Sequence, residues 1–151
     1  MNEVEPKLIS SAFEININTV TKWLSNPSRK PHIQYLSLAL DAVSERLFYA
    51  DLLNCDMDVN AIADRLGLDN FLSSEIEGIS SRTLRSWISN PQKKKLIVGI
   101  LIGFHWFELT QLAEESNNSL EELISILDLR SVSLVEAVKM YKASSQLVQL
   151  L

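Results

Sequence analysis

Apolar residues recur every three or four positions along most of the chain, which is the spacing of amphipathic helices. Ile33–Leu53 shows this pattern most clearly. One face of the helix expected there carries five apolar residues, Leu36, Leu40, Val43, Leu47 and Ala50. Leu96–Leu112 is apolar almost all round, so we expect it to be the central helix of the fold. No stretch alternates apolar and polar residues as a strand would, and the pattern therefore predicts an all-α fold.

Three shorter helices are expected, over Leu8–Phe13, Asn18–Ser25 and Arg82–Ser89. We expect Asn18 to cap the second helix and Ser81 the third, since both side chains can accept a hydrogen bond from a backbone amide at a helix start. A proline shortly beyond the second and third helices ends each of them, because the residue before proline avoids the helical region.

The C-terminal part of the chain is also expected to be helical. Ser119 and Glu122 have the spacing of a capping box at the start of a helix over Ser119–Leu127. Val132–Leu151 has a partly apolar face, and we expect its apolar tail, Leu147–Leu151, to be packed within the chain or across a dimer. Gly99 and Gly103 lie one helical turn apart in the central helix, which allows another helix to pack closely there.

The sequence contains an internal repeat. Leu8–Ile33 matches Phe71–Ile97 with eleven identities and one inserted residue, and each copy contains the pattern Trp-x-Ser-Asn-Pro. Val59–Leu68 resembles Leu120–Leu129 more weakly. We therefore predict two related helical subdomains, unit one over residues 1–57 and unit two over residues 58–118. Residues 119–151 are either a truncated third unit or a dimerisation element.

Composition excludes several classes of function. The single cysteine, Cys55, rules out an intrachain disulfide framework and favours the cytoplasm. The first residues are acidic and do not resemble a signal peptide, and the longest apolar run, Leu96–Phe107, is too short to cross a membrane. His32 and His105 lack the spacing of metal ligands. We therefore expect no metal, no cofactor and no catalytic set.

The repeated unit has the outline of a helix-turn-helix: a short helix, a short turn, a second short helix and a longer helix. Val20, Trp23 and Leu24 are expected to face inward, as are their counterparts in unit two. The outward positions hold side chains that can bond DNA. The candidates for base contact are Asn18, Thr21, Lys22, Arg82, Arg85 and Ser86. The candidates for phosphate contact are Ser25, Arg29, Lys30, Ser89, Lys93, Lys94 and Lys95.

The distribution of charge supports this hypothesis, although the net charge is −5. Ile15–Pro31 and Ile79–Lys95 together hold eight of the fourteen basic residues and no acidic residue. The rest of the chain carries six basic residues and all nineteen acidic ones, so it is strongly negative. Two matched basic segments on an acidic protein are typical of a polyanion-binding surface.

The segment Leu8–Leu47 resembles the Cro and phage-repressor class of helix-turn-helix domains. Ile17–Leu24 is similar to the turn and recognition helix of that class, and Ser28–Pro31 to its basic loop ending in proline. Glu77–Leu84 resembles its glycine-containing turn, whereas unit one has no glycine there. The resemblance implies a sequence-specific DNA-binding transcriptional regulator, of the kind often carried by phages and mobile elements, which would lie at the nucleoid.

A second hypothesis from another class stays open: an adaptor or antirepressor that has kept the duplicated scaffold without binding DNA. Its partner would meet the acidic face, or a homodimer would form through the C-terminal helices. The acidic residues concerned are Glu114, Glu115, Glu121, Glu122 and Asp128. One continuous basic surface would favour DNA, whereas basic residues paired with acids would favour the adaptor.

Overall fold

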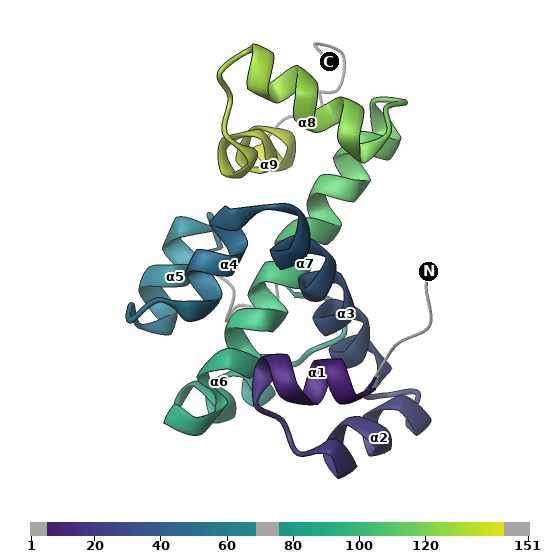
Figure 1. Ribbon diagram of the computed structural model, residues 1–151, viewed down its shortest axis with the longest axis vertical. Coiled ribbons are helices and arrows are strands. Elements are labelled where there is room, and N and C mark those ends of the chain that lie inside the picture. The colour runs from purple at the N-terminus through teal and green to yellow at the C-terminus, as the bar shows by residue number, and fades with distance from the viewer. Residues whose placement is uncertain (1–5, 69–75, 144–151) are drawn as a thin grey trace.

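The computed structural model describes residues 6–68 and 76–143, and within these ranges every regular element is a helix (Figure 1). The all-α prediction is therefore confirmed. The elements are α1 (Pro6–Phe13), α2 (Ile17–Ser25), α3 (Lys30–Glu45), α4 (Leu47–Asn54), α5 (Val59–Arg65), α6 (Ser81–Ile88), the short 3₁₀ helix η1 (Pro91–Lys93), α7 (Lys94–Glu115), α8 (Leu120–Leu129) and α9 (Leu134–Ala143).

Helix α7 is the central helix, as predicted. It packs against α1, α3, α4, α5, α6, α8 and α9, and most of its side chains are buried. In Figure 1 it runs from the end of the molecule that holds α2 and α6 to the opposite end, where α8 and α9 lie. The expectation from the run Leu96–Phe107 that this helix is too short to cross a membrane is corrected, because the whole segment Pro91–Glu115 is long and apolar enough; 78% of its apolar window is nevertheless buried inside the protein. Such burial is expected of the core helix of a soluble protein.

The contact between α3 and α7 is the most extensive between any two described helices, and two glycines make it possible. A Cβ atom on Gly103 would overlap the backbone carbonyl of Tyr35, and a Cβ on Gly99 would lie 2.6 Å from the ring of Phe13 and 2.9 Å from Leu36. The close packing predicted for this glycine pair is confirmed.

The prediction of one helix over Ile33–Leu53 is wrong, because the chain breaks at Arg46 into α3 and α4. Arg46 has extended backbone angles (φ −136°, ψ 122°), and its amide donates to the Ala42 carbonyl at the end of α3. The break turns α4 onto α7, where the buried hydroxyl of Tyr49 lies 2.8 Å from Nδ1 of His105. Amphipathic spacing continues across this break, so periodicity alone did not reveal it.

The helix caps differ in detail from the predicted ones. Asn16, not Asn18, caps α2, and Ser80, not Ser81, caps α6. The reason is that each helix begins before its predicted start. The capping box at Ser119 is confirmed, since both of its hydrogen bonds are present. The tail Leu147–Leu151 lies outside the described residues.

Local details of the repeat recur in the structure. The side chains of Asn26 and Asn90 each accept from the amide of the second residue after them. The turn after α5 and the turn after α8 each place a residue in the left-handed region, Gly67 (φ 70°) and Ser131 (φ 55°), although the sequence match aligns Gly67 with Asp128 rather than with Ser131. The hydrophobic core is one cluster that runs through both units, so the boundaries at 57/58 and 118/119 stay predictions.

The repeated tryptophans of the two units meet each other. The ring centroids of Trp23 and Trp87 are 5.9 Å apart. His32 lies against both, with its ring centroid 4.9 Å from Trp23 and 5.1 Å from Trp87. The His32 side chain is 2% exposed, and its Nδ1 has no hydrogen-bond partner among the described residues. Burial, with a smaller contribution from Arg29, lowers the pKa of His32 to about 4.

Replacing Gly103 by alanine tests the close packing of α3 and α7. The new methyl group would meet the rigid backbone of Tyr35 rather than a movable side chain, so we expect Gly103→Ala to lower the free energy of unfolding by at least about 2 kcal/mol. Urea denaturation measures this change. Ser125→Ala, at an exposed position of α8, is the control and should change stability by less than about 0.5 kcal/mol. Equal stability of the two variants would contradict the packing described.

The buried histidine predicts sensitivity to acid. The pKa of His32 is lower in the native state than in the unfolded chain, so its contribution to stability is complete above pH 6.5 and is lost as the pH falls toward 4. The loss should reach about 2–3 kcal/mol near pH 4. Urea denaturation at pH 7 and pH 4.5 measures the loss. The His32→Phe variant keeps an aromatic ring at this position, but that ring cannot bind a proton. The variant should therefore lose distinctly less stability than the wild-type protein between these two pH values.

Candidate nucleic-acid interface

Helices α1 and α2 are joined by a short turn, Glu14–Asn16, without a glycine. Glu14 itself adopts the left-handed conformation (φ 54°), and the amide of Ile15 donates to the carbonyl of Ser10 to close the end of α1. Gly78 (φ 88°) takes the same conformation at the equivalent place of unit two, before α6. The missing glycine of unit one is therefore replaced by a glutamate in a backbone conformation that usually favours glycine. The segment before Gly78, residues 69–75, lies outside the described residues.

Helices α2 and α6, which we call the candidate recognition helices, present the faces that the sequence predicts. Val20 and Leu84 are fully buried, and Trp23 and Trp87 pack on each other. The outward positions are all exposed: Asn18, Thr21, Lys22 and Ser25 on α2, and Arg82, Arg85, Ser86 and Ser89 at α6. Their exposure is confirmed, and their contact with DNA stays a prediction.

Three of the outward hydroxyls are already engaged within their own helices. Thr21 donates to the Ile17 carbonyl at 3.0 Å, Ser25 to the Lys22 carbonyl at 3.1 Å, and Ser89 to the Ser86 carbonyl at 2.9 Å. A phosphate oxygen needs a donor, and these hydroxyl protons are donated elsewhere. Ser25 and Ser89 are therefore weaker candidates for phosphate contact than the sequence suggested, and the cations carry more of that role.

The eight basic residues of the two matched segments divide into two groups. Lys94 donates to the Cys55 carbonyl at 3.1 Å, and Lys95 forms an ion pair with Glu14 at 3.3 Å. These two lysines tie unit two to unit one, so they are less available to phosphates than predicted. The other six are exposed and form no ion pair with a described residue: Lys22, Arg29, Lys30, Arg82, Arg85 and Lys93.

The candidate recognition helices lie at one end of the molecule (Figure 1), and the Trp23–Trp87 pair joins them. Glu14, just before α2, pairs with Lys95, which follows α6. On the other side Gly78, just before α6, packs on Pro31, which follows α2; a Cβ on Gly78 would lie 2.7 Å from the proline ring. Between these contacts the two tryptophans meet. Lys95 is in the first turn of α7 and Pro31 in the first turn of α3, so the turn before each candidate recognition helix contacts the long helix of the other unit.

Five of the acidic residues lie at the opposite end. Glu114, Glu115, Glu121, Glu122 and Asp128 are exposed on α7 and α8. Asp128 pairs with Arg46 at 3.6 Å, and a hydrogen bond to Glu115 raises the pKa of Tyr141 to about 12. Helix α7 has 22 residues and spans about 33 Å, so it holds this acidic end well away from α2 and α6.

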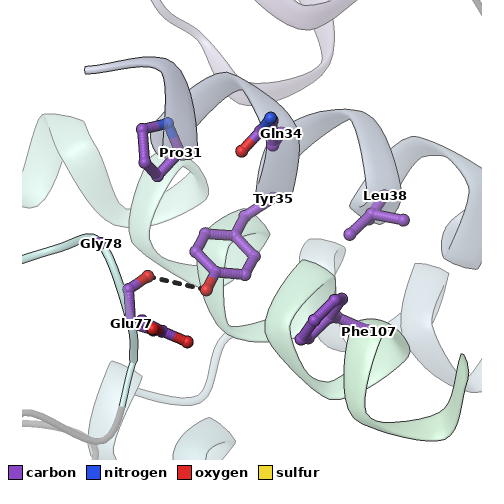
Figure 2. A pocket seen from close by; sticks show the side chains of 7 residues that line it. All are labelled: Pro31, Gln34, Tyr35, Leu38, Glu77, Gly78 and Phe107. Carbon is purple, nitrogen blue, oxygen red and sulfur yellow. Dashed lines mark hydrogen bonds between the residues drawn. The ribbon is translucent and has the colours of Figure 1, made fainter. Parts of the chain in front are cut away.

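Sequence reasoning missed a cleft of about 430 Å³ beside α3, drawn in Figure 2. The hydroxyl of Tyr35 donates to the Glu77 carbonyl at 2.7 Å, which ties α3 to the turn before α6. Burial, with nearby Glu77, raises the pKa of Tyr35 to about 12, so the hydroxyl keeps its proton for this bond. The cleft is lined by Pro31, Gln34, Tyr35, Leu38, Glu77, Gly78 and Phe107. Tyr35 and Glu77 are far apart in the sequence, and no local pattern indicates their contact.

Potential ligands for metals do not gather in the described part of the chain, where no three histidine, cysteine or acidic side chains come together. His32 packs between the indole rings of two tryptophans, and the ring of His105 is hydrogen-bonded to the Tyr49 hydroxyl. Both histidines are therefore part of the packed interior. The Cys55 thiol donates to the Leu52 carbonyl at 3.3 Å.

Comparison with known proteins does not identify a family for this chain. No protein-family model, no curated protein and no solved structure matches the chain.

Proposed function

We propose that the protein binds double-stranded DNA through the end that carries α2 and α6, and that it acts as a transcriptional regulator at the nucleoid. One observation carries the proposal. Six exposed cations lie on the two candidate recognition helices and the segments that follow them, which contain no acidic residue. The resemblance of Leu8–Leu47 to phage repressors supports the same function.

The carboxylates at the far end of the protein do not oppose this function. The negative residues of α8 and the end of α7 lie about 33 Å from the start of α7, along a helix of 22 residues. The Debye length at physiological ionic strength is about 8 Å, so repulsion between a DNA phosphate and those carboxylates is screened. Attraction to nearby cations dominates at the basic end.

The adaptor hypothesis rests on a different observation. Two of the eight basic residues, Lys94 and Lys95, are engaged within the protein. The acidic end remains exposed and would meet a basic protein partner, or a second copy through the C-terminal helices. Because six cations stay exposed, the DNA hypothesis is the better supported of the two.

Fluorescence anisotropy of a labelled pool of duplex DNA tests the proposal. With four to six phosphates neutralised, the logarithm of affinity should fall with the logarithm of salt concentration at a slope of about −4 to −5. Reversing two charges of α6, with Arg82→Glu and Arg85→Glu together, should abolish binding at physiological salt, because attraction becomes repulsion. Both residues are exposed, so the variant should fold, which circular dichroism checks.

The matched control changes two charges at the acidic end. Glu121→Gln with Glu122→Gln should leave the affinity for DNA within about twofold, since these groups are screened from the bound duplex. Absence of binding by the folded wild-type protein at low salt would overturn the proposal and favour the adaptor.

A further inference from the structure

The cleft beside α3 has the size of a site for a small organic molecule. One face of α3 lines it with residues at helical spacing, and Phe107 of α7 and the turn before α6 complete it (Figure 2). Its volume of about 430 Å³ lies toward the lower end of the range of small-molecule pockets, about 300–1,000 Å³. The residues that α3 contributes are Pro31, Gln34, Tyr35 and Leu38.

The walls of the cleft are mainly apolar and aromatic. Phe107 is a large hydrophobic residue, yet 36% of it is exposed. Its ring centroid lies 6.5 Å from that of Tyr35, and the two rings are nearly perpendicular, at 81°. Leu38 and Pro31 add aliphatic surface. The hydrophobic effect therefore favours a ligand whose apolar or aromatic body covers the exposed part of Phe107.

The charges of the cleft favour a cation over an anion. Among the seven lining residues, Glu77 carries a negative charge and none carries a positive one. Figure 2 shows the Glu77 side chain extending from the turn toward the side of the cleft where Phe107 lies. A second carboxylate, Glu108, is near: burial, Glu77 and Glu108 together raise the pKa of Tyr35 to about 12. Both carboxylates would repel an anionic ligand.

The hydroxyl group of the cleft is not offered to an anion either. Tyr35 donates its hydroxyl proton to the Glu77 carbonyl at 2.7 Å. Among the side chains that line the cleft, the Gln34 amide is then the remaining donor. An ammonium group, by contrast, is attracted both to a carboxylate and to the face of an aromatic ring.

We propose that this cleft binds a small organic cation, an ammonium group attached to an aromatic or apolar body. The ammonium group contacts the Glu77 carboxylate, and the apolar body packs on Phe107 and Leu38. The inference does not rest on the proposed function, because none of the lining residues is a candidate for contact with DNA.

Titration with three small probes, followed by two-dimensional NMR of the full chain, tests the inference. The probes are 2-phenylethylammonium, 2-phenylethanol and 3-phenylpropionate, which share a phenyl ring and differ in charge. The ammonium compound should shift the amide signals of Gly78 and of the Gln34 side chain, with a dissociation constant of about 1–10 mM. The alcohol should bind about fivefold more weakly, and the carboxylate more weakly still.

Two substitutions separate the charge from the ring. Glu77→Gln removes the charge but keeps the backbone carbonyl that Tyr35 uses, so it should weaken binding of the ammonium compound by about three- to fivefold and leave the alcohol unchanged. Phe107→Ala removes one wall and should weaken binding of both compounds. Glu121→Gln, at an exposed position of α8, is the matched control and should change neither affinity. Circular dichroism checks that each variant folds.

Two kinds of result would overturn the inference. Absence of shifts at Gly78 and Gln34 with all three probes would show that the cleft is not a ligand site. Equal affinity for the ammonium compound and the alcohol, or an unchanged affinity for the ammonium compound in Glu77→Gln, would show that the site does not select a cation. Binding of DNA is measured separately, so either result leaves the proposed function intact.

Discussion

The close crossing of α3 and α7 is the contact on which the rest of the structure depends. Two glycines of α7 let it touch the backbone of α3, and larger side chains would separate the helices. Because α3 follows α2 after a short loop and α7 follows α6 after η1, their crossing also constrains how α2 and α6 lie relative to each other. The close packing of α3 on α7 inside the core thus helps to place α2 and α6 at the surface.

The two units are related in sequence, but their contacts are not equivalent. The turn of unit one carries Glu14 and pairs with Lys95, whereas the turn of unit two carries Gly78 and packs on Pro31. One side is an ion pair between partly exposed groups and contributes little to stability by itself. The other is a steric contact between a glycine and a proline. This asymmetry accompanies the difference in side chains on α2 and α6.

The six exposed cations of the matched segments and the carboxylates at the end of α7 and on α8 lie at opposite ends of the protein. The exposed cations of the two matched segments lie at the end with α2 and α6, and exposed carboxylates lie near α8 (Figure 1). Salt screening makes each end electrostatically independent. A net negative charge favours solubility and disfavours nonspecific association, while the local cations at the end with α2 and α6 are what the proposed binding of DNA uses.

Residues close in the sequence determined the helices, the repeat and the outward faces of α2 and α6. Spacing of apolar residues decides which side of a helix is buried, so Val20 and Leu84 faced inward and Lys22 and Arg85 outward as expected. The capping box at Ser119 is equally local. These features need no knowledge of the rest of the fold.

Only the tertiary structure decided the break at Arg46, the left-handed conformation of Glu14, the engagement of Lys94 and Lys95, and the contact of Trp23 on α2 with Trp87 on α6. Each of the last two depends on partners dozens of residues away, such as Cys55 for Lys94 and Trp87 for Trp23. Local patterns cannot encode such partners, because the same amphipathic helices can pack in several relative orientations. The free energy of the whole core selects one of them.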